Sequence, residues 1–169
     1  MHGQLAREFA EKAARLHDET EFEPAVHQLV DLACTVLHCD HASLLLVHDG
    51  ILEEVEATDP AVEKADQLEM ELHEGPCLAA VDGDMCFIDD TLSDDRWPRW
   101  SSGAAALGLR SVLAARLSMP GSMTGALTLY GDQPARFSDE AGAVARVLAH
   151  HATAIAESTH RRSPGLAAS

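Results

Sequence analysis

The side chains best suited to chemistry in this chain are its thiols, at Cys34, Cys39, Cys77 and Cys86. They form no Cys-x-x-Cys pair and have no histidine at zinc-ribbon spacing, so reduced and mostly buried thiols are expected. Cys77 differs because it follows Gly75 and Pro76 at the predicted start of a helix, where free N–H groups and the helix dipole favour a thiolate. The sequence therefore predicts that Cys77 is either the most reactive thiol or a small residue of the core.

Histidines that cluster in the sequence do not predict a metal site. His38, Cys39 and His41 span the junction of a predicted helix and a predicted strand, where their side chains diverge. On the last predicted helix, His150 and His151 point about 100 degrees apart, and no further ligand follows one turn later. We expect no metal ligands in this chain.

Trp97 and Trp100 are the only tryptophans, and both lie in or beside a predicted loop. Large aromatic side chains there can line a pocket for a planar ligand or fasten the loop to the core. The sequence has no Gly-x-x-x-x-Gly-Lys phosphate loop, no Gly-x-Ser-x-Gly elbow and no His-Glu-x-x-His motif. It therefore identifies no catalytic residue and no cofactor.

The elements that position these residues alternate between helical and strand patterns. Helical spacing of apolar residues predicts an N-terminal helix, a second helix from about Pro24, and a last helix from Ser138 to about Ser158. Asp49-Gly50 predicts a tight hairpin. Short helices are expected after Gly75-Pro76 and over residues 100–107. Strands are expected over residues 41–48, 51–58, 68–72, 85–89, 111–118 and 123–130.

This order of elements predicts an α+β domain. It has a central antiparallel sheet of about six strands, with N- and C-terminal helices packed on one face and pocket-covering loops and short helices on the other. The expected division is an N-terminal helix over residues 1–19, the main domain over 20–158 and a flexible tail over 159–169.

Charge excludes one class of partner. The net charge is -16, and Lys64 is the only Lys or Arg between Leu16 and Asp95. Such a field repels phosphate backbones, so direct nucleic-acid binding is not expected. No apolar run approaches the roughly 18 residues that span a bilayer. We therefore expect a cytoplasmic protein without membrane contact.

Several segments resemble one known family. Residues 74–81, 97–100 and 107–113 are similar to the signature of the GAF small-molecule-sensing domains. Residues 125–130 and 137–140 fit the last strand and last helix of that family, so the resemblance covers about residues 20 to 158. The similarity is closest to the actinobacterial GAF domains of GAF-ANTAR regulators, here without the RNA-binding ANTAR part.

The resemblance implies a non-catalytic regulatory domain that senses a small molecule, in signal transduction and transcription regulation. The pocket would lie between the sheet and the covering segments 74–81 and 89–109. The residues expected to converge on it from one side of the sheet are Cys77, Phe87, Trp97, Trp100, Leu109 and Ser111.

Two GAF subgroups with recognisable ligand motifs do not match. The cyclic-nucleotide group carries Asn-Lys and then Phe-x-x-x-Asp-Glu, whereas residues 137–140 read Phe-Ser-Asp-Glu. The bilin group commonly has a pocket Cys followed by His, whereas here His38 precedes Cys39. Neither a cyclic nucleotide nor a bilin is predicted.

Two alternative functions stay open. Free methionine sulfoxide reductases are GAF-fold redox enzymes, and Gly75-Pro76-Cys77 resembles one of their Gly-x-Cys segments. Their other redox cysteines lie in the region that here spans residues 90–108 and contains no Cys. A lone thiol cannot complete a disulfide relay. The other alternative is a purely structural dimerisation module.

The last predicted helix is apolar on more of its surface than one sheet contact covers. One stripe runs through Ala141, Val144, Ala145, Leu148, Ala152 and Ile155. A second stripe runs through Ala143, Val147, His150 and Ala154 and needs a partner. The partner is either the predicted N-terminal helix, through Leu5, Phe9 and Leu16, or the same helices of a second chain. We favour the homodimer, with Val147, His150, His151 and Ala154 at its interface. Mild acid is expected to loosen this dimer if either histidine is buried there. A separate output protein is the other expected partner.

Overall fold

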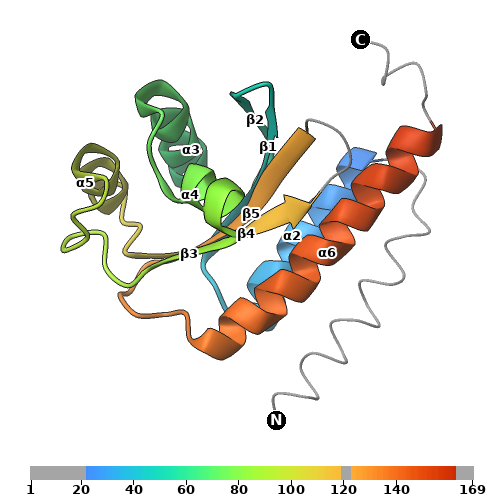
Figure 1. Cartoon of the computed structure of the whole chain (residues 1–169). Coiled ribbons are helices and arrows are strands. Elements are labelled where there is room, and N and C mark those ends of the chain that lie inside the picture. Colours follow the sequence, from blue (N-terminus) through green and yellow to red (C-terminus); the bar gives the residue numbers. More distant parts are fainter. Residues whose placement is uncertain (1–21, 119–122, 163–169) are drawn as a thin grey trace.

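The computed structural model describes residues 22–118 and 123–162, drawn in colour in Figure 1. The predicted N-terminal helix, the connection between the strands predicted over residues 111–118 and 123–130, and residues 163–169 of the predicted tail lie outside these residues. The described elements form three layers, with a sheet between two groups of helices (Figure 1).

The central layer is a five-stranded antiparallel sheet in the order β2-β1-β5-β4-β3. Its strands are β1 (His41–His48), β2 (Ile51–Ala57), β3 (Met85–Ile88), β4 (Ser111–Ser118) and β5 (Met123–Gly131). β1 and β2 join through Asp49 and Gly50, whose φ angles of 53° and 79° form the tight turn that the sequence predicted. The predicted α+β class and antiparallel sheet are confirmed.

The helices α2 (Phe22–Leu37) and α6 (Asp139–Arg162) lie side by side across one face of the sheet (Figure 1). The Ser138 hydroxyl accepts a hydrogen bond from the Ala141 N–H, as expected of a helix cap. The buried side of α6 carries the first predicted stripe, including Val144, Leu148 and Ile155. The predicted packing of the C-terminal helix on this face is therefore confirmed.

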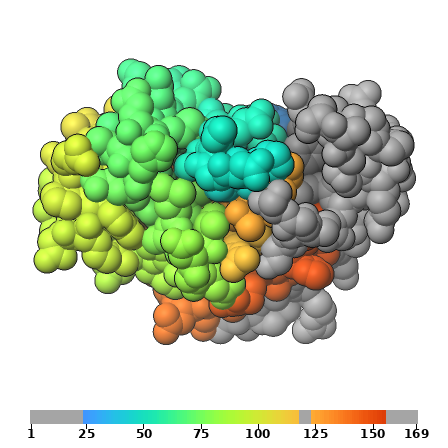
Figure 2. All heavy atoms as spheres, turned by 45° about the horizontal axis from the view of Figure 1, so that its top comes forward, coloured from blue at the N-terminus to red at the C-terminus, as the bar shows by residue number. Residues whose placement is uncertain are grey.

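The opposite face carries three shorter helices, α3 (Pro60–Leu72), α4 (Pro76–Gly83) and α5 (Pro98–Ala106). In the space-filling view the green segments of α3 and α4 and the yellow-green segment around α5 form one continuous layer (Figure 2). This layer and the α2–α6 layer each bury a separate apolar cluster against the sheet.

The predicted strand over residues 68–72 is wrong, because this segment is the last part of α3. The Asp59 carboxylate caps the helix by accepting from the Ala61 N–H at 2.8 Å, and Pro60 fits its first turn. The buried residues of α3 are spaced as one helical face: Val62, Ala65, Asp66 and Glu69. Asp66 and Glu69 are acids, so the spacing of apolar residues alone did not predict the helix. The sheet consequently has five strands in the described residues.

Candidate ligand-binding site

A cluster of buried polar side chains lies between α3 and the sheet. Ser43 of β1 and Thr128 of β5 are direct partners in the antiparallel ladder. Because side chains alternate along a strand, both point to the face that α3, α4 and α5 cover. Both residues are fully buried, and neither hydroxyl has a hydrogen-bond partner among the described residues.

Asp66 of α3 is fully buried on the same side of the sheet, close to the Ser43 hydroxyl. The phenol of Tyr130 donates a hydrogen bond to Asp66 Oδ1 at 3.2 Å, whereas Oδ2 has no partner among the described residues. Burial is the main cause that raises the pKa of Asp66 well above its usual value, and the neighbouring Glu54 carboxyl raises it further. The Ser43 hydroxyl lies close enough to oppose this shift, and the Glu54 carboxyl lies close enough to interact directly with Asp66, although neither makes a hydrogen bond of normal geometry with it.

Glu69, one turn further along α3, is also fully buried. Its Oε2 accepts a hydrogen bond from the Leu78 N–H at 2.9 Å, in the first turn of α4. Burial raises the pKa of Glu69 to about 8, and the backbone N–H groups of Leu78 and Cys77 counteract part of that rise. Oε1 has no partner among the described residues.

Gly75 allows α4 to approach Glu69 this closely. Its φ of +148° is unfavourable for other residues, and a Cβ there would lie 2.6 Å from the Glu69 Cδ. The Gly-Pro-Cys segment therefore brings the positive end of α4 onto a buried carboxyl of α3.

Glu54 of β2 contributes a third carboxyl from the sheet. It pairs with Leu45, which faces α3 to α5, and its Oε2 is buried without a partner among the described residues. A register shift in β2 places Val55 and Glu56 toward α2 instead. Glu54, Asp66 and Glu69 together with Ser43 and Thr128 are called the acidic cluster below.

Four of the six predicted ligand-binding residues lie on the same face as the acidic cluster. Cys77, Trp100 and Leu109 are buried in its apolar surroundings, and Trp97 packs partly buried against them. The Trp100 Nε1–H donates to the carbonyl oxygen of Ala65 at 3.0 Å, which ties α5 to α3. Whether these residues bind a ligand stays a prediction.

Phe87 and Ser111 correct the predicted convergence, because they lie on the opposite face. Cys86 and Val112 face α3 to α5, so strand alternation turns Phe87 and Ser111 away. Phe87 packs against α6, where a Cβ on Gly142 would lie 2.8 Å from its Cζ. The Ser111 hydroxyl donates to the Gln133 carbonyl at 2.7 Å.

Cys77 does not have the environment of a reactive thiol. It is fully buried, and burial raises its pKa well above the usual value, with Glu69 and Asp66 adding to the rise. Burial also raises the pKa of Cys86 to about 11. Cys34 is only partly buried, and its interaction with the Cys39 thiol lowers its pKa. The packed form of the Cys77 prediction therefore fits the structure.

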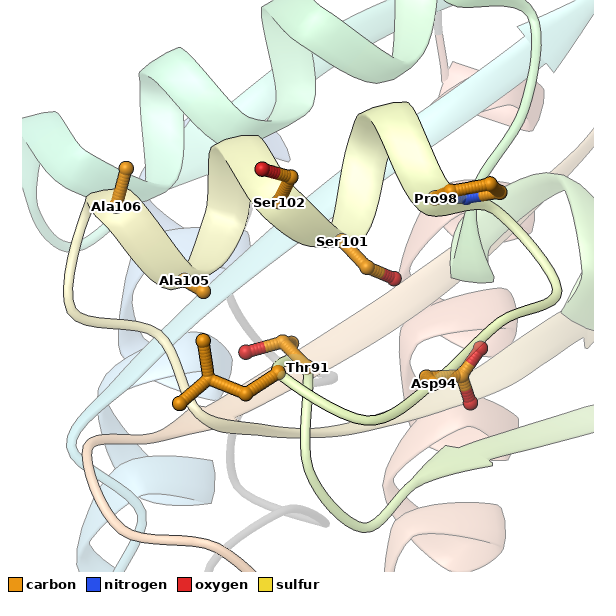
Figure 3. Close-up of a pocket in the computed structure, with 8 residues that line it drawn as sticks. Thr91, Asp94, Pro98, Ser101, Ser102, Ala105 and Ala106 are labelled. Carbon is orange, nitrogen blue, oxygen red and sulfur yellow. The ribbon is translucent and has the colours of Figure 1, made fainter.

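A second candidate feature is an open hollow of about 420 Å³ beside α5. Ser101 and Ala105 point from α5 toward the loop that carries Thr91 and Asp94 (Figure 3). The Ser101 hydroxyl is buried without a partner among the described residues, and Thr91 holds the loop by donating to the Leu109 carbonyl at 2.7 Å. The residues that line the hollow lie in segment 89–109, which the sequence predicted to cover a pocket.

Sequence reasoning missed the acidic cluster. Its signal is nevertheless present in the sequence, because Asp66 and Glu69 continue the helical spacing of Val62 and Ala65 on the buried side of α3.

Within the described residues, no group of three or more His, Cys, Asp or Glu side chains is placed to hold a metal ion. No helix in the described part of the chain is both long and apolar enough to cross a membrane.

Comparisons with known proteins agree with this architecture. The GAF domain family model matches residues 21–155, and the chain belongs to this family. No curated protein matches the sequence. The following similarities to solved structures show the fold.

Free methionine-R-sulfoxide reductase from Neisseria meningitidis, solved in complex with its substrate, has a TM-score of 0.71 at 15% identity, covering 95% of this chain and 91% of that one. A domain assigned to a two-component sensor histidine kinase of Sinorhizobium meliloti 1021 has a TM-score of 0.64 at 20% identity, covering 83% and 92%. The GAF domain of an Acinetobacter phosphoenolpyruvate-protein phosphotransferase has a TM-score of 0.66 at 13% identity, covering 94% and 93%.

Proposed function

We propose that this GAF domain is a non-catalytic regulatory domain that binds a small molecule between α3, α4 and the sheet. The observation that carries the proposal is the acidic cluster. A buried polar group without a partner costs about 1–3 kcal/mol, so the five unpartnered atoms of the cluster, one on each side chain, together cost on the order of 5 kcal/mol or more. A ligand that supplies the missing partners would offset this cost and give the site its affinity.

The route of the signal is part of the proposal. β4 lies between α4 on one face of the sheet and α6 on the other. In addition, Arg146 of α6 forms an ion pair with Asp84, the residue that follows α4. A ligand that shifts α4 would therefore act directly on α6, whose Val147, His150, His151 and Ala154 are the predicted dimer interface.

The biological setting that we propose follows the resemblance to GAF-ANTAR regulators. In this proposal the domain acts in actinobacterial transcription regulation in the cytoplasm. It passes its signal through a homodimer or to a separate output protein. The sensor kinase and phosphotransferase likenesses support a regulatory role for the fold.

Native mass spectrometry of the protein purified from its own host tests the proposal. We expect a retained small molecule of defined mass, which is released on unfolding and identified by liquid chromatography and fragmentation. Protein that carries no small molecule, and that no added metabolite extract stabilises against heat, would rule out a sensory site here.

The competing hypothesis is a thiol-based reductase, which the likeness to the Neisseria enzyme supports at the level of fold. The full burial and raised pKa of Cys77 argue against it, because a thiolate is the attacking species in thiol–disulfide exchange. We expect no thiol-dependent reduction of free methionine sulfoxide. Turnover that disappears in Cys77→Ser would replace our proposal by this one.

A further inference from the structure

When its carboxyls are ionised, the acidic cluster contains more hydrogen-bond acceptors than donors. Glu54 Oε2, Asp66 Oδ2 and Glu69 Oε1 are buried and have no partner among the described residues. The two hydroxyls of the cluster, on Ser43 and Thr128, are equally unpartnered. Tyr130 and the α4 backbone have already used their donors on the other oxygens of Asp66 and Glu69.

No lysine or arginine among the described residues lowers the pKa of Asp66 or Glu69. Arg116 of β4 lies on the same face of the sheet as Ala114, and its buried Nε has no hydrogen-bond partner among the described residues. Asp90, Asp94 and Asp40 each pair with an arginine, but those pairs lie outside the cluster. An ionised carboxylate without a counter-charge is strongly disfavoured in an apolar interior. The carboxyls must therefore hold protons or receive a cation, and once ionised they repel an anionic ligand.

The surroundings of the cluster are apolar and aromatic. Leu45, Cys77 and Trp100 are buried in the same region and offer carbon and ring surface to a ligand. A bare metal ion does not suit this environment, since no group of three acidic, histidine or cysteine ligands in the described residues is placed to hold one. A carbon skeleton with a charged nitrogen matches both the walls and the carboxyls.

We propose that Glu54, Asp66 and Glu69, with the hydroxyls of Ser43 and Thr128, recognise a small organic cation that carries a primary ammonium or guanidinium group. This inference rests on the proposed function, because it names the ligand class of the same site. The N–H groups of the cation donate to the unpartnered carboxyl oxygens, and its carbon chain lies against Trp100 and Leu45. Ligand entry requires α3 to move, since α3 supplies both fully buried acids.

Isothermal titration calorimetry with four simple probes tests the class of ligand. Agmatine and n-butylamine are the cations, while n-butanol and n-butyrate are the neutral and anionic controls of matched size. We expect the two cations to bind and the two controls not to bind at the same concentration.

Proton release adds a second readout. Burial raises the pKa of Glu69 to about 8, so the free protein holds a proton there at pH 7 that a bound cation would displace. Titrations in phosphate and in Tris should therefore differ in heat by the released protons. Agmatine affinity should rise from pH 6 to pH 8.5, because the carboxyls ionise while the guanidinium stays charged.

Two isosteric variants connect binding to the cluster. Asp66→Asn and Glu69→Gln each remove a charge without changing shape, and each should weaken agmatine binding at least about tenfold. Glu71→Gln is the matched control, because Glu71 is exposed on the same helix. If Asp66→Asn fails to fold, Glu69→Gln still decides, since its amide oxygen can accept from the Leu78 N–H.

The outcomes separate this inference from the proposed function. Cation binding that is lost in the cluster variants and kept in Glu71→Gln supports both, as does a host-derived cation that the variants do not retain. A neutral or anionic molecule found by native mass spectrometry keeps the sensory function but overturns the cationic ligand. Equal binding of all four probes, or variants with unchanged affinity, also overturns it. Absence of any bound molecule or probe overturns both.

Discussion

Glu69 of the acidic cluster has two opposing effects on the stability of the fold. Glu69 stabilises the start of α4 by accepting the Leu78 N–H, yet its own burial disfavours the charged form. The folded pKa of about 8 lies above the ordinary value of 4.5, so the folded state binds more protons than the unfolded state between these two pH values. Stability must therefore fall as the pH rises through this window.

Replacing Glu69 tests this linkage. The unfolding free energy of the free protein should fall between pH 5 and pH 8.5, with a contribution from Glu69 on the order of 3–5 kcal/mol. Glu69→Gln stays neutral, so its loss over the same range should be smaller by that amount. Urea unfolding followed by circular dichroism measures both, and Glu71→Gln should behave as the wild type. Parallel pH curves for Glu69→Gln and wild type would mean that Glu69 is not desolvated.

The exposure of each cysteine side chain decides how fast its thiol reacts. Cys34 is partly buried and Cys77 is fully buried, so iodoacetamide at neutral pH should label Cys34 first, by roughly tenfold or more. Peptide mass spectrometry after short labelling gives the ratio, with Cys34→Ser as the control for site assignment. Faster labelling of Cys77 would restore the prediction that it is the reactive thiol.

At the scale of elements, the contact of α3 with the start of α4 defines the site. α3 carries Asp66 and Glu69 on its buried face, and α4 begins where its backbone meets Glu69. The contact depends on Gly75, both for its positive φ and for the space that a side chain would occupy. A side chain at residue 75 would displace the Glu69 carboxyl from the start of α4.

A pair of glycine variants in this region tests that dependence. Gly75→Ala should lower the unfolding free energy by roughly 2–4 kcal/mol, through backbone strain and the clash with Glu69. Gly83→Ala, at the other end of α4, has no atom within 4 Å of the added Cβ. It should change stability by no more than about 1 kcal/mol, in the stabilising direction. Equal stability of the two variants would show that the α3–α4 contact is looser than described.

At the scale of the whole molecule, the sheet separates a layer that holds the site from a layer suited to assembly. The buried face of α6 packs on the sheet, while Ala143 and His150 are exposed and Val147 and Ala154 are only half-buried. This distribution leaves part of the predicted second stripe of α6 available to another helix. We therefore keep the homodimer as a proposal.

Charge substitutions on that stripe test the dimer. Val147→Glu should convert a dimer to a monomer in sedimentation velocity at micromolar concentration, because a carboxylate would be buried at the seam. Val147 also touches the core, so Ala143→Glu, on the exposed part of the stripe, serves as the second variant. Ser102→Glu on α5 should leave the dimer intact. Wild-type protein that is monomeric at all concentrations would refute the assembly.

The sequence by itself determined the class of the fold and most of its elements. The hairpin at Asp49-Gly50, the strands on either side of it and the capped helix after Ser138 follow from local rules of backbone conformation and apolar spacing. Such rules depend on residues close together in the chain, so they can be recognised without a structure. The resemblance of residues 97–100 and 107–113 to the GAF signature also indicated the family from the sequence alone.

The tertiary structure alone decided where the candidate site lies. Burial of Asp66 and Glu69 cannot be read from residue types, because acids are ordinarily exposed and their helical spacing was masked by a period-two pattern at residues 68–72. The faces of Phe87 and Ser111 likewise depended on strand register, in which a shift of one residue reverses every side chain. The acidic cluster joins Ser43 to Thr128 across the sheet, and only folding brings residues so distant in the chain together.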